Sequence, residues 1–367
     1  MAAGHIVICL HDFARGGTER VAITLARHWL DAGRKVTFLC GSRTGGVLDQ
    51  VDPRAEVIEL SPPVPRSLTS RLQLGPAMAA RLPGLAPDAV FLTGNFHFIL
   101  AHAIRRVLPE VPIVAKVSNP LLPALPPPLG ALARRVLRRY VAPIDRLVFM
   151  ADELAAEGRA LLPGAVAAVI AEPNLPAGRI SLPRVGPADP PLVLVLARME
   201  PQKNLALALK AFAELVKLRP ARLLILGEGA QRTKLEALAA RLGIAGQVAM
   251  PGYVPDVAAH LAQASVLLLS SRYEGYPAVV VEALAADVPV VSTDCTPCLA
   301  SLIDRPIRGE VVPAATPATL AQALARALDL PFASARERAY AVAHHDAAAS
   351  GAAYLALFDG LAGAAPA

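Results

Sequence analysis

Short apolar runs alternate along the chain with segments in which apolar residues recur at helical spacing. The first run, 5–10, is followed by a Gly-Gly turn and then by Val21, Leu25 and Trp29, which share one helix face. Further runs in the first half stand at 36–40, 57–60, 89–92, 113–117 and 146–150. Because strands that alternate with helices form parallel sheets covered on both faces, the pattern predicts a doubly wound α/β domain.

The same alternation begins again after a break rich in proline. Six prolines and two glycines lie between 173 and 191, and new apolar runs follow at 192–196, 223–226, 248–250, 266–269 and 288–291. We therefore expect two Rossmann-like domains facing each other across a cleft, with bounds 1–175 and 191–344 and a linker at 176–190. A terminal helix at about 345–367 carries an apolar stripe that would pack back on the first domain: Tyr354, Leu357, Phe358 and Leu361.

Two segments of the first half could contribute to binding of an acceptor substrate. Five prolines at 120–128 predict a loop, which would fit a mobile flap. The helix predicted at 132–140 has a basic face, for which a solvated surface and contact with a membrane both stay open: Arg134, Arg135, Arg138 and Arg139.

Composition narrows the class of protein. No stretch of about 18 apolar residues is uninterrupted, so we expect no transmembrane helix. The N-terminus lacks the features of a secretory signal, which predicts a cytoplasmic protein. Residues 1–180 hold 20 Lys and Arg against 14 Asp and Glu, which accounts for the whole net charge of +6. That excess favours an anionic partner such as a membrane surface or a lipid-phosphate acceptor; no nucleic-acid partner is expected.

The four cysteines are too few for a disulfide framework and wrongly spaced for a four-ligand zinc site. Cys295 and Cys298 have the spacing of a redox pair, but no thioredoxin-like pattern precedes them. A plain loop is therefore the preferred interpretation.

Two cations follow the first strand of the second half. Arg198 and Lys203 stand at the end of the run 192–196 and before the next helix. A guanidinium offers a planar set of donors and an ammonium a compact charge, so with backbone N–H groups they can neutralise a pyrophosphate without a metal ion. Solvated loop charges are the alternative interpretation.

A later segment places two carboxylates eight residues apart. Glu274 lies in a Gly-Pro turn, and Glu282 lies in the helix that this turn opens. The neighbours of Glu282 are apolar, and an unpaired carboxylate is costly to bury there. Glu282 thus needs a polar partner, which ribose hydroxyls would supply.

Together these residues resemble the family 4 retaining glycosyltransferases, the group 1 glycosyl transferases of GT-B fold, whose signature is two glutamates separated by seven residues after an earlier Arg and Lys pair. The resemblance spans nearly the whole chain. It implies that Glu274 contacts the donor sugar, Glu282 the ribose, and Arg198 and Lys203 the phosphates. It also assigns the backbone of the turn to the diphosphate: Gly275, Tyr276, Pro277 and Ala278.

Other matches to the family are shorter. Gly16 and Gly17 match a turn whose backbone approaches the donor phosphate. Gly227, Gly252 and Tyr253 match positions that receive the nucleotide base, with ordinary strand-end turns as the alternative.

The chain departs from the family in two places. Where members often carry a histidine near the acceptor, this sequence has Asn119. Either Asn119 supplies the hydrogen bond, or His97 or His102 replaces the histidine, unless these two are structural. The segment 294–301 stands where a glycine-rich turn and a glutamate are common, so its contacts stay open.

The resemblance implies a retaining enzyme that moves a hexose from a UDP- or GDP-sugar to a glycan or lipid-linked acceptor. The reaction would serve polysaccharide or glycolipid synthesis. The candidate catalytic residues are Glu274, Arg198, Lys203 and Asn119. No Asp-x-Asp occurs, so neither a metal nor another cofactor is expected. The alternatives are an epimerase of the same fold and a non-catalytic scaffold that binds nucleotide sugars. An NAD-dependent oxidoreductase is disfavoured because no Gly-x-Gly-x-x-Gly follows the first strand. Peripheral contact with the inner face of the cell membrane would suit the basic first half.

Overall fold

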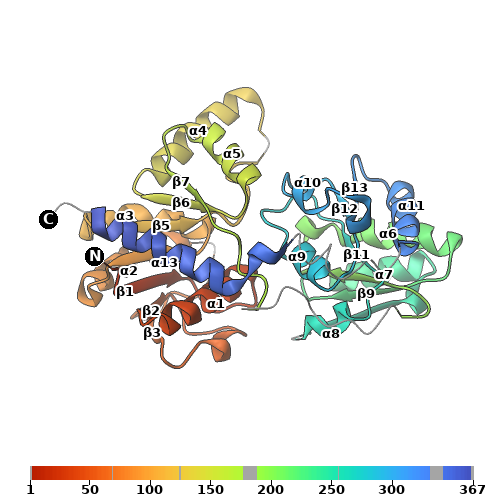
Figure 1. Ribbon diagram of the computed structural model, residues 1–367, viewed down its shortest axis with the longest axis horizontal. Helices are drawn as coiled ribbons and strands as arrows, with labels where there is room; N and C mark the ends of the chain where they lie inside the picture. The colour runs from red at the N-terminus through yellow and green to blue at the C-terminus, as the bar shows by residue number, and fades with distance from the viewer. Residues whose placement is uncertain are drawn as a thin grey trace. The chain divides into compact units, whose positions relative to one another are not determined.

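The computed structural model describes residues 2–67, 69–123, 125–176, 188–254, 256–330 and 342–364. The chain divides into two compact units: unit 1 is Met1–Ala177 with Asp346–Ala367, and unit 2 is Gly178–His345. In each unit, helices cover both faces of a parallel sheet (Figure 1). The predicted fold class, two Rossmann-like doubly wound domains, is thus confirmed.

Unit 1 contains a seven-stranded sheet in the order β3-β2-β1-β4-β5-β6-β7. Its strands are β1 (His5–Leu10), β2 (Lys35–Cys40), β3 (Glu56–Glu59), β4 (Ala89–Leu92), β5 (Ile113–Lys116), β6 (Arg146–Phe149) and β7 (Ala167–Val169). Its helices are α1 (Gly17–Asp31), α2 (Ser70–Arg81), α3 (Ala101–Val107), α4 (Pro127–Val141), α5 (Asp152–Leu161) and α13 (Ala347–Ala364), with short 3₁₀ turns η1 (Leu48–Gln50), η2 (Leu82–Leu85) and η3 (Asn95–Leu100). The winding reverses between β1 and β4, so the carboxyl ends of these two strands form the topological switch point.

Unit 2 contains a six-stranded sheet in the order β10-β9-β8-β11-β12-β13. Its strands are β8 (Leu192–Leu196), β9 (Arg222–Leu226), β10 (Val248–Gly252), β11 (Val266–Leu269), β12 (Val290–Thr293) and β13 (Gly309–Val312). Its helices are α6 (Leu205–Leu218), α7 (Arg232–Arg241), α8 (Val257–Leu261), α9 (Ala278–Ala285), α10 (Leu299–Leu302) and α11 (Pro317–Leu328), with 3₁₀ turns η4 (Pro201–Lys203), η5 (Ala245–Gln247), η6 (Pro306–Arg308) and η7 (Ala343–His345). Its switch point lies between β8 and β11.

The strands beside the switch points are apolar runs because both of their faces are covered. β1, β4, β8 and β11 are buried at every position. Parallel strands between two helical layers have no face that meets water, so alternation of polar and apolar residues disappears. The polar residues come directly after the strands, at their carboxyl ends.

The helix α13 packs on α1 within unit 1, as the dark blue ribbon shows in Figure 1. The indole Nε1 of Trp29 donates to the carbonyl of Gly351 at 3.2 Å. Tyr354 and Phe358 pack edge-on against Trp29 and Phe91, with ring centroids 5.2 to 6.3 Å apart. Two members of the predicted stripe therefore contribute large buried rings to the core of unit 1.

The structure differs from the sequence-based elements at several edges. The short edge strands β7 and β13 were not predicted, because neither is a long apolar run. The strand expected at 288–291 begins at Val290. The loop predicted through 128 is wrong for its last two residues, since α4 begins at Pro127. Proline is tolerated in a first helical turn, where its missing N–H has no intrahelical acceptor.

Part of the predicted linker, residues 177–187, lies outside the described residues, as do residues 331–341 of the predicted second domain and 365–367 of the predicted terminal helix. Among the described residues, no helix is both long enough and apolar enough to cross a bilayer.

Candidate active site

The loops that follow β8 and β11 are joined to each other at the switch point of unit 2. The Ser270 hydroxyl donates to the carbonyl of Lys203 at 2.9 Å, and the backbone N–H of Arg272 donates to the carbonyl of Gln202 at 2.8 Å. The Gln202 amide in turn donates to the carbonyl of Tyr273 at 2.9 Å. These bonds hold the loop with the predicted cations against the loop with the first predicted glutamate.

Glu274 lies at the centre of this junction. Its Oε1 accepts from Lys203 Nζ at 2.6 Å and from the Ser271 hydroxyl at 2.5 Å. The Glu274 side chain is 8% exposed and that of Lys203 is 19% exposed. The structure therefore brings together two residues that the sequence predicted for one site, and charge-assisted hydrogen bonds fix the carboxylate.

Arg198, the other predicted cation, has a different environment. It is exposed, and its guanidinium makes no hydrogen bond or ion pair with the described residues. All five of its N–H donors are thus open to an anionic ligand.

The end of β12 supports the Glu274 loop from behind. The Thr293 hydroxyl donates to the carbonyl of Ser271 at 2.6 Å, and the Thr296 hydroxyl donates to the carbonyl of Gly275 at 2.9 Å. The Glu274 N–H donates to the carbonyl of Cys295 at 2.9 Å. The segment 294–301, which departs from the family pattern, thus positions the glutamate loop through its backbone and threonine.

The residues after Glu274 lead into α9. Tyr276 is 9% exposed, and its hydroxyl forms a 2.7 Å hydrogen bond with Nε2 of the fully buried His345. Pro277 caps α9 without a side-chain hydrogen bond, so the first N–H groups of α9 have no side-chain acceptor at the cap. Glu282 is partly buried in the second turn of α9. Its predicted partner, a ribose, stays a prediction.

The glycine turns beside this site have a packing role. Gly227 has a φ of +143°, and a Cβ on it would lie 2.1 Å from the carbonyl oxygen of Ala197. Gly252 has a φ of +98°, and a Cβ there would meet the Glu228 carboxylate at 2.2 Å. Tyr253 is 37% exposed. Close backbone packing requires glycine at 227, and the positive φ favours glycine at 252. Contact with a base stays a prediction for Gly227, Gly252 and Tyr253.

In unit 1, the predicted Gly16-Gly17 turn opens α1. Gly17 is its first residue and Gly16 its cap, and a Cβ on Gly16 would lie 2.3 Å from Glu19 Oε2. The Glu19 carboxyl is buried, and this burial raises its pKa against the opposing effects of its own N–H and of Arg66. Gly16 therefore makes room for a carboxyl group of the same helix.

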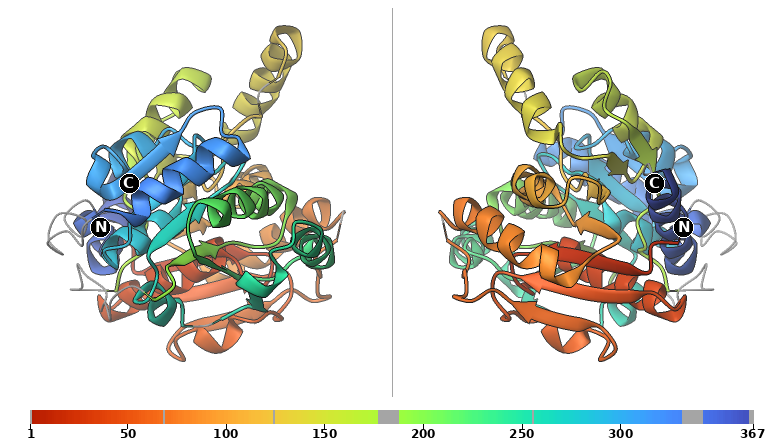
Figure 2. Two further views of the ribbon diagram at one scale, coloured as in Figure 1. Left: turned by 90° about the vertical axis from the view of Figure 1, so that its right-hand side faces the viewer. Right: turned by 90° about the vertical axis from the view of Figure 1, so that its left-hand side faces the viewer.

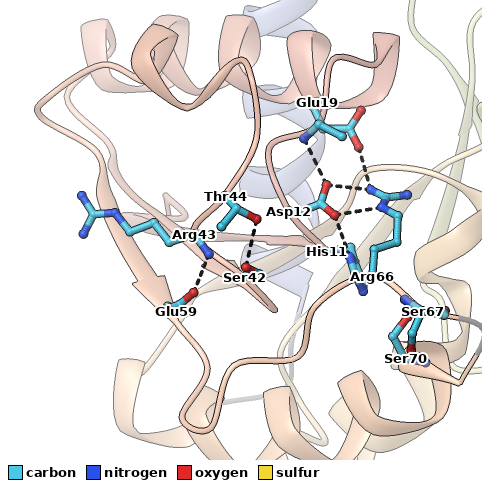
Figure 3. Close-up of polar contacts among 11 residues, drawn as sticks. His11, Asp12, Glu19, Ser42, Arg43, Thr44, Glu59, Arg66, Ser67 and Ser70 are labelled. Atoms are coloured by element: carbon cyan, nitrogen blue, oxygen red, sulfur yellow. Dashed lines mark hydrogen bonds and ion pairs between the residues drawn. The ribbon is translucent and has the colours of Figure 1, made fainter. Parts of the chain in front are cut away.

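A polar cluster at the carboxyl end of β1 was missed by the sequence analysis (Figure 3). Asp12 accepts from Arg66 Nε and Nη2, both at 2.8 Å, and from His11 Nδ1 at 3.0 Å. Arg66 Nη2 also reaches Glu19 Oε1 at 3.4 Å. Burial acts to raise the pKa of Asp12, but the hydrogen bonds from Arg66 and His11 outweigh it and hold the pKa well below the usual range. A polar pair directly after a buried strand was the available signal.

The predicted acceptor-side residues lie after β4 and β5. Asn119 is exposed, and the Asn95 side chain bonds to both its N–H and its carbonyl at 3.2 and 3.0 Å. His97 is buried, and burial followed by the charge of Arg66 lowers its pKa to about 3. His102 Nε2 bonds to the carbonyl of Arg139 at 2.7 Å. His102 is thus bonded to the backbone of α4 and His97 is buried and neutral, and the roles of Asn119 and of the two histidines stay predictions.

The cysteines are free thiols. Cys295 and Cys298 are buried, and burial raises the pKa of Cys295 to about 11. A thiol of that kind is a poor nucleophile and a poor metal ligand. No cluster of three or more His, Cys, Asp and Glu in the described part of the chain could hold a metal ion.

A cavity of about 650 Å³ lies beside β13 and α11. It shares Asp294 and Thr296 with the edge of the candidate site, but its lining contains none of the predicted donor residues. The assignment of the donor site therefore rests on the junction of the β8 and β11 loops.

Two protein-family models match the chain. The model for glycosyl transferases group 1 matches residues 183–344, and the model for glycosyltransferase family 4 matches residues 15–170. The two matches are consecutive and leave only the ends and a short middle segment unmatched.

Individual proteins show the same similarity. The lipopolysaccharide core biosynthesis glycosyltransferase LpsE of Rhizobium meliloti is 36% identical over 107 residues, which cover 29% of this chain and 31% of that protein. The structure of WaaG, a glycosyltransferase involved in lipopolysaccharide biosynthesis, has a TM-score of 0.68 at 18% identity, covering 97% of this chain and 100% of that one. Anabaena HepE in complex with UDP and glucose has a TM-score of 0.69 at 16% identity, covering 97% and 95%. At these identities the structures show a shared fold.

Proposed function

Because this chain belongs to the group 1 and family 4 glycosyltransferases, we propose that it transfers a hexose-type sugar from a UDP- or GDP-sugar to a glycan or lipid-linked acceptor, in polysaccharide or glycolipid synthesis. The observation that carries the proposal is the junction in unit 2, where Lys203 and Glu274 form a partly buried ion pair and where Arg198, just after β8, makes no hydrogen bond or ion pair with the described residues. Of the similar proteins, LpsE and WaaG are glycosyltransferases of lipopolysaccharide biosynthesis, and the structure of HepE holds UDP and glucose.

Different side chains of unit 2 bind different parts of the donor. Arg198 and Lys203 neutralise the diphosphate as it leaves, which makes a metal ion dispensable. The Glu274 carboxylate accepts hydrogen bonds from the hydroxyls of the sugar, and Glu282 accepts them from the ribose. The N–H groups at the start of α9 face the same phosphates, where the helix dipole favours negative charge.

The sugar keeps its anomeric configuration during the reaction. The bond from the anomeric carbon to the diphosphate breaks while the bond to the acceptor oxygen forms on the same face. The acceptor proton goes to the departing diphosphate oxygen. Protein groups then contribute by positioning both substrates and stabilising charge, with Asn119 on the acceptor side.

The enzyme works in the cytoplasm, at the inner face of the cell membrane, and α4 is the surface in contact with lipid. This helix extends away from the rest of unit 1 in both views of Figure 2. Leu129, Leu132 and Val136 follow one another at intervals of three and four residues, and they are 55, 59 and 57% exposed. They form one apolar stripe, and the four predicted arginines are exposed on the same helix, which contains no acidic residue. Such a helix suits the boundary of an anionic bilayer.

The donor assignment is tested by thermal stabilisation. The melting temperature of the wild type is measured with UDP, GDP, UDP-glucose and GDP-mannose in EDTA, then repeated with Glu282→Ala and with Glu214→Ala, a surface control on α6. A ligand of the folded state must raise the melting temperature. We expect one nucleotide series to stabilise the wild type and the control but not Glu282→Ala. If no nucleotide stabilises the wild type, the proposed donor site is wrong.

Retention is tested on the slow hydrolysis of the donor that is identified in this way. Proton NMR at early times shows the anomer of the released sugar before it equilibrates. Release of the donor's own anomer supports retention, and release of the opposite anomer contradicts it. Release of an epimer would instead support the epimerase alternative.

A further inference from the structure

Two guanidinium groups lie beside one aromatic ring at the switch point of unit 1. The Cζ atoms of Arg66 and Arg71 are 5.7 and 4.3 Å from the centroid of the Phe96 ring. Phe96 belongs to η3, just after β4, and Arg71 belongs to the first turn of α2. The ring is partly exposed. Open parallel sheets bind ligands at this position, outside the carboxyl ends of the strands where the winding reverses.

Arg66 is held in place but keeps donors for a ligand. Asp12 accepts from its Nε and one Nη2 proton, and Asp12 is itself fixed by His11 and by the N–H of Ala14 at 3.0 Å. The Nη1 group makes no hydrogen bond within the described ranges. A guanidinium whose position is set by a buried carboxylate loses little entropy when it binds an anion with its remaining donors.

Arg71 supplies the second cation. It is exposed, it lies over the face of Phe96, and it forms no ion pair with any residue that the structure describes. Burial is the main cause of the low pKa of the neighbouring His97, and the charges of Arg66 and Arg71 lower that pKa further. That histidine is therefore neutral at physiological pH, and the positive potential at Phe96 comes from the two arginines.

We infer that this pair binds an anionic group of the acceptor, a phosphate or a carboxylate, between Arg66 and Arg71 with the adjoining sugar or chain against Phe96. Two planar guanidinium groups match the oxygen geometry of both anions. Arg66 is engaged by Asp12 and reaches Glu19, but its Nη1 group and the guanidinium of Arg71 make no hydrogen bond with the described residues and can donate to such an anion. The inference rests on the proposed transferase function, because it specifies the acceptor of that reaction.

Isothermal titration tests this inference with four probes in low-salt buffer: geranyl phosphate, glucose 6-phosphate, glucuronate and the neutral methyl α-glucoside. The first three distinguish a lipid phosphate, a sugar phosphate and a sugar carboxylate as the source of the anion. They are titrated into the wild type, Arg66→Gln, Arg71→Gln and the control Arg81→Gln, which changes an exposed arginine in the last turn of α2.

We expect at least one anionic probe to bind the wild type and the control at least ten times more tightly than methyl α-glucoside. Arg66→Gln and Arg71→Gln should each weaken that binding by about tenfold or more, the effect of one hydrogen bond to a charged group. Arg71 is exposed, so its variant tests the site even if Arg66→Gln unfolds. The inference is overturned if no anionic probe binds, if the neutral probe binds equally well, or if Arg71→Gln behaves like Arg81→Gln.

The donor measurement separates this inference from the proposed function. Nucleotide stabilisation of Arg71→Gln should match that of the wild type, because Arg71 is not one of the proposed donor residues. If Arg71→Gln loses anion binding but keeps nucleotide binding, the donor assignment still holds. If the wild type binds the anion but no nucleotide, the proposed function is wrong and the anion site serves another function.

Discussion

The switch points of the two units have the same topology but different chemistry. In unit 2, two loops are joined by hydrogen bonds between side chains and backbone, and a partly buried ion pair, Lys203 with Glu274, lies at their junction. In unit 1, the carboxylate of Asp12 is buried among His11, Arg66 and the N–H of Ala14. In unit 2 a cation and a hydroxyl fix a carboxylate, which we propose to bind the donor sugar; in unit 1 a carboxylate fixes a cation.

This difference matches the two substrates that we propose. The proposed donor, a UDP- or GDP-sugar, has a diphosphate and hydroxyl groups, so its site needs cations and at least one hydrogen-bond acceptor. The proposed acceptor site binds its anionic ligand through two cations, Arg66 and Arg71. The comparison therefore predicts that a substitution of Glu274 mainly lowers the rate of transfer, and that a substitution of Asp12 mainly lowers the stability of unit 1.

The largest effect is expected for Glu274→Gln. The amide keeps the shape but loses the charge that holds Lys203 and receives the sugar hydroxyls. Transfer should fall about 100- to 1000-fold in kcat, the range for the loss of one preorganised electrostatic contact. The measurement is the steady-state rate, with circular dichroism to confirm that the variant is folded.

A matched control is Glu214→Gln, which removes the charge from an exposed Glu–Lys pair on α6. It should keep wild-type activity, because exposed pairs contribute little. If Glu274→Gln keeps the wild-type rate, the proposed role of this glutamate is wrong, and so is the difference that we draw between the two switch points.

An intermediate effect is expected for Asp12→Asn, on stability. The pKa of Asp12 is depressed in the folded state, so its contribution is fully present above its unfolded pKa, near 4, and is lost as the pH falls through the folded value. At pH 7 the variant should lose about 2 kcal/mol, because Arg66 is left without its partner. Below about pH 4 the difference from the wild type should shrink. Urea unfolding at several pH values measures both.

The exposed pair of Arg219 with Asp329 provides the control for this experiment. Asp329→Asn should change stability by less than about 1 kcal/mol at every pH. If Asp12→Asn behaves in the same way, Asp12 does not anchor Arg66, and the distinction drawn between the two sites fails.

The two sites also differ in how far the sequence predicts them. Arg198 and Lys203 lie five residues apart, and Glu274 and Glu282 lie on one turn and its helix, so spacing along the chain carries the signal. Asp12, Arg66 and Phe96 come from three segments that only the sheet order brings together. The apolar runs predict the central strands of both sheets, because a strand that is buried on both faces must be apolar. They miss β7 and β13, because a short edge strand need not be apolar.

The smallest effect is expected at α4, and it tests whether unit 1 is the side that meets a lipid surface. Leu132→Ser with Val136→Ser removes most of the apolar stripe without touching either switch point. Binding to vesicles that contain phosphatidylglycerol should weaken about tenfold in a sedimentation assay, since partial burial of two aliphatic side chains contributes a little over 1 kcal/mol. Turnover of a water-soluble acceptor should stay unchanged.

The control removes an equally exposed leucine from unit 2, Leu218→Ser, at the end of α6, where the side chain is 60% exposed. Its vesicle binding should equal that of the wild type. Replacement of the four α4 arginines by glutamine should weaken binding to anionic vesicles further and make it independent of salt. Equal binding of all variants would show that α4 is a solvated helix, and the lipid surface would then have to be sought elsewhere on the protein.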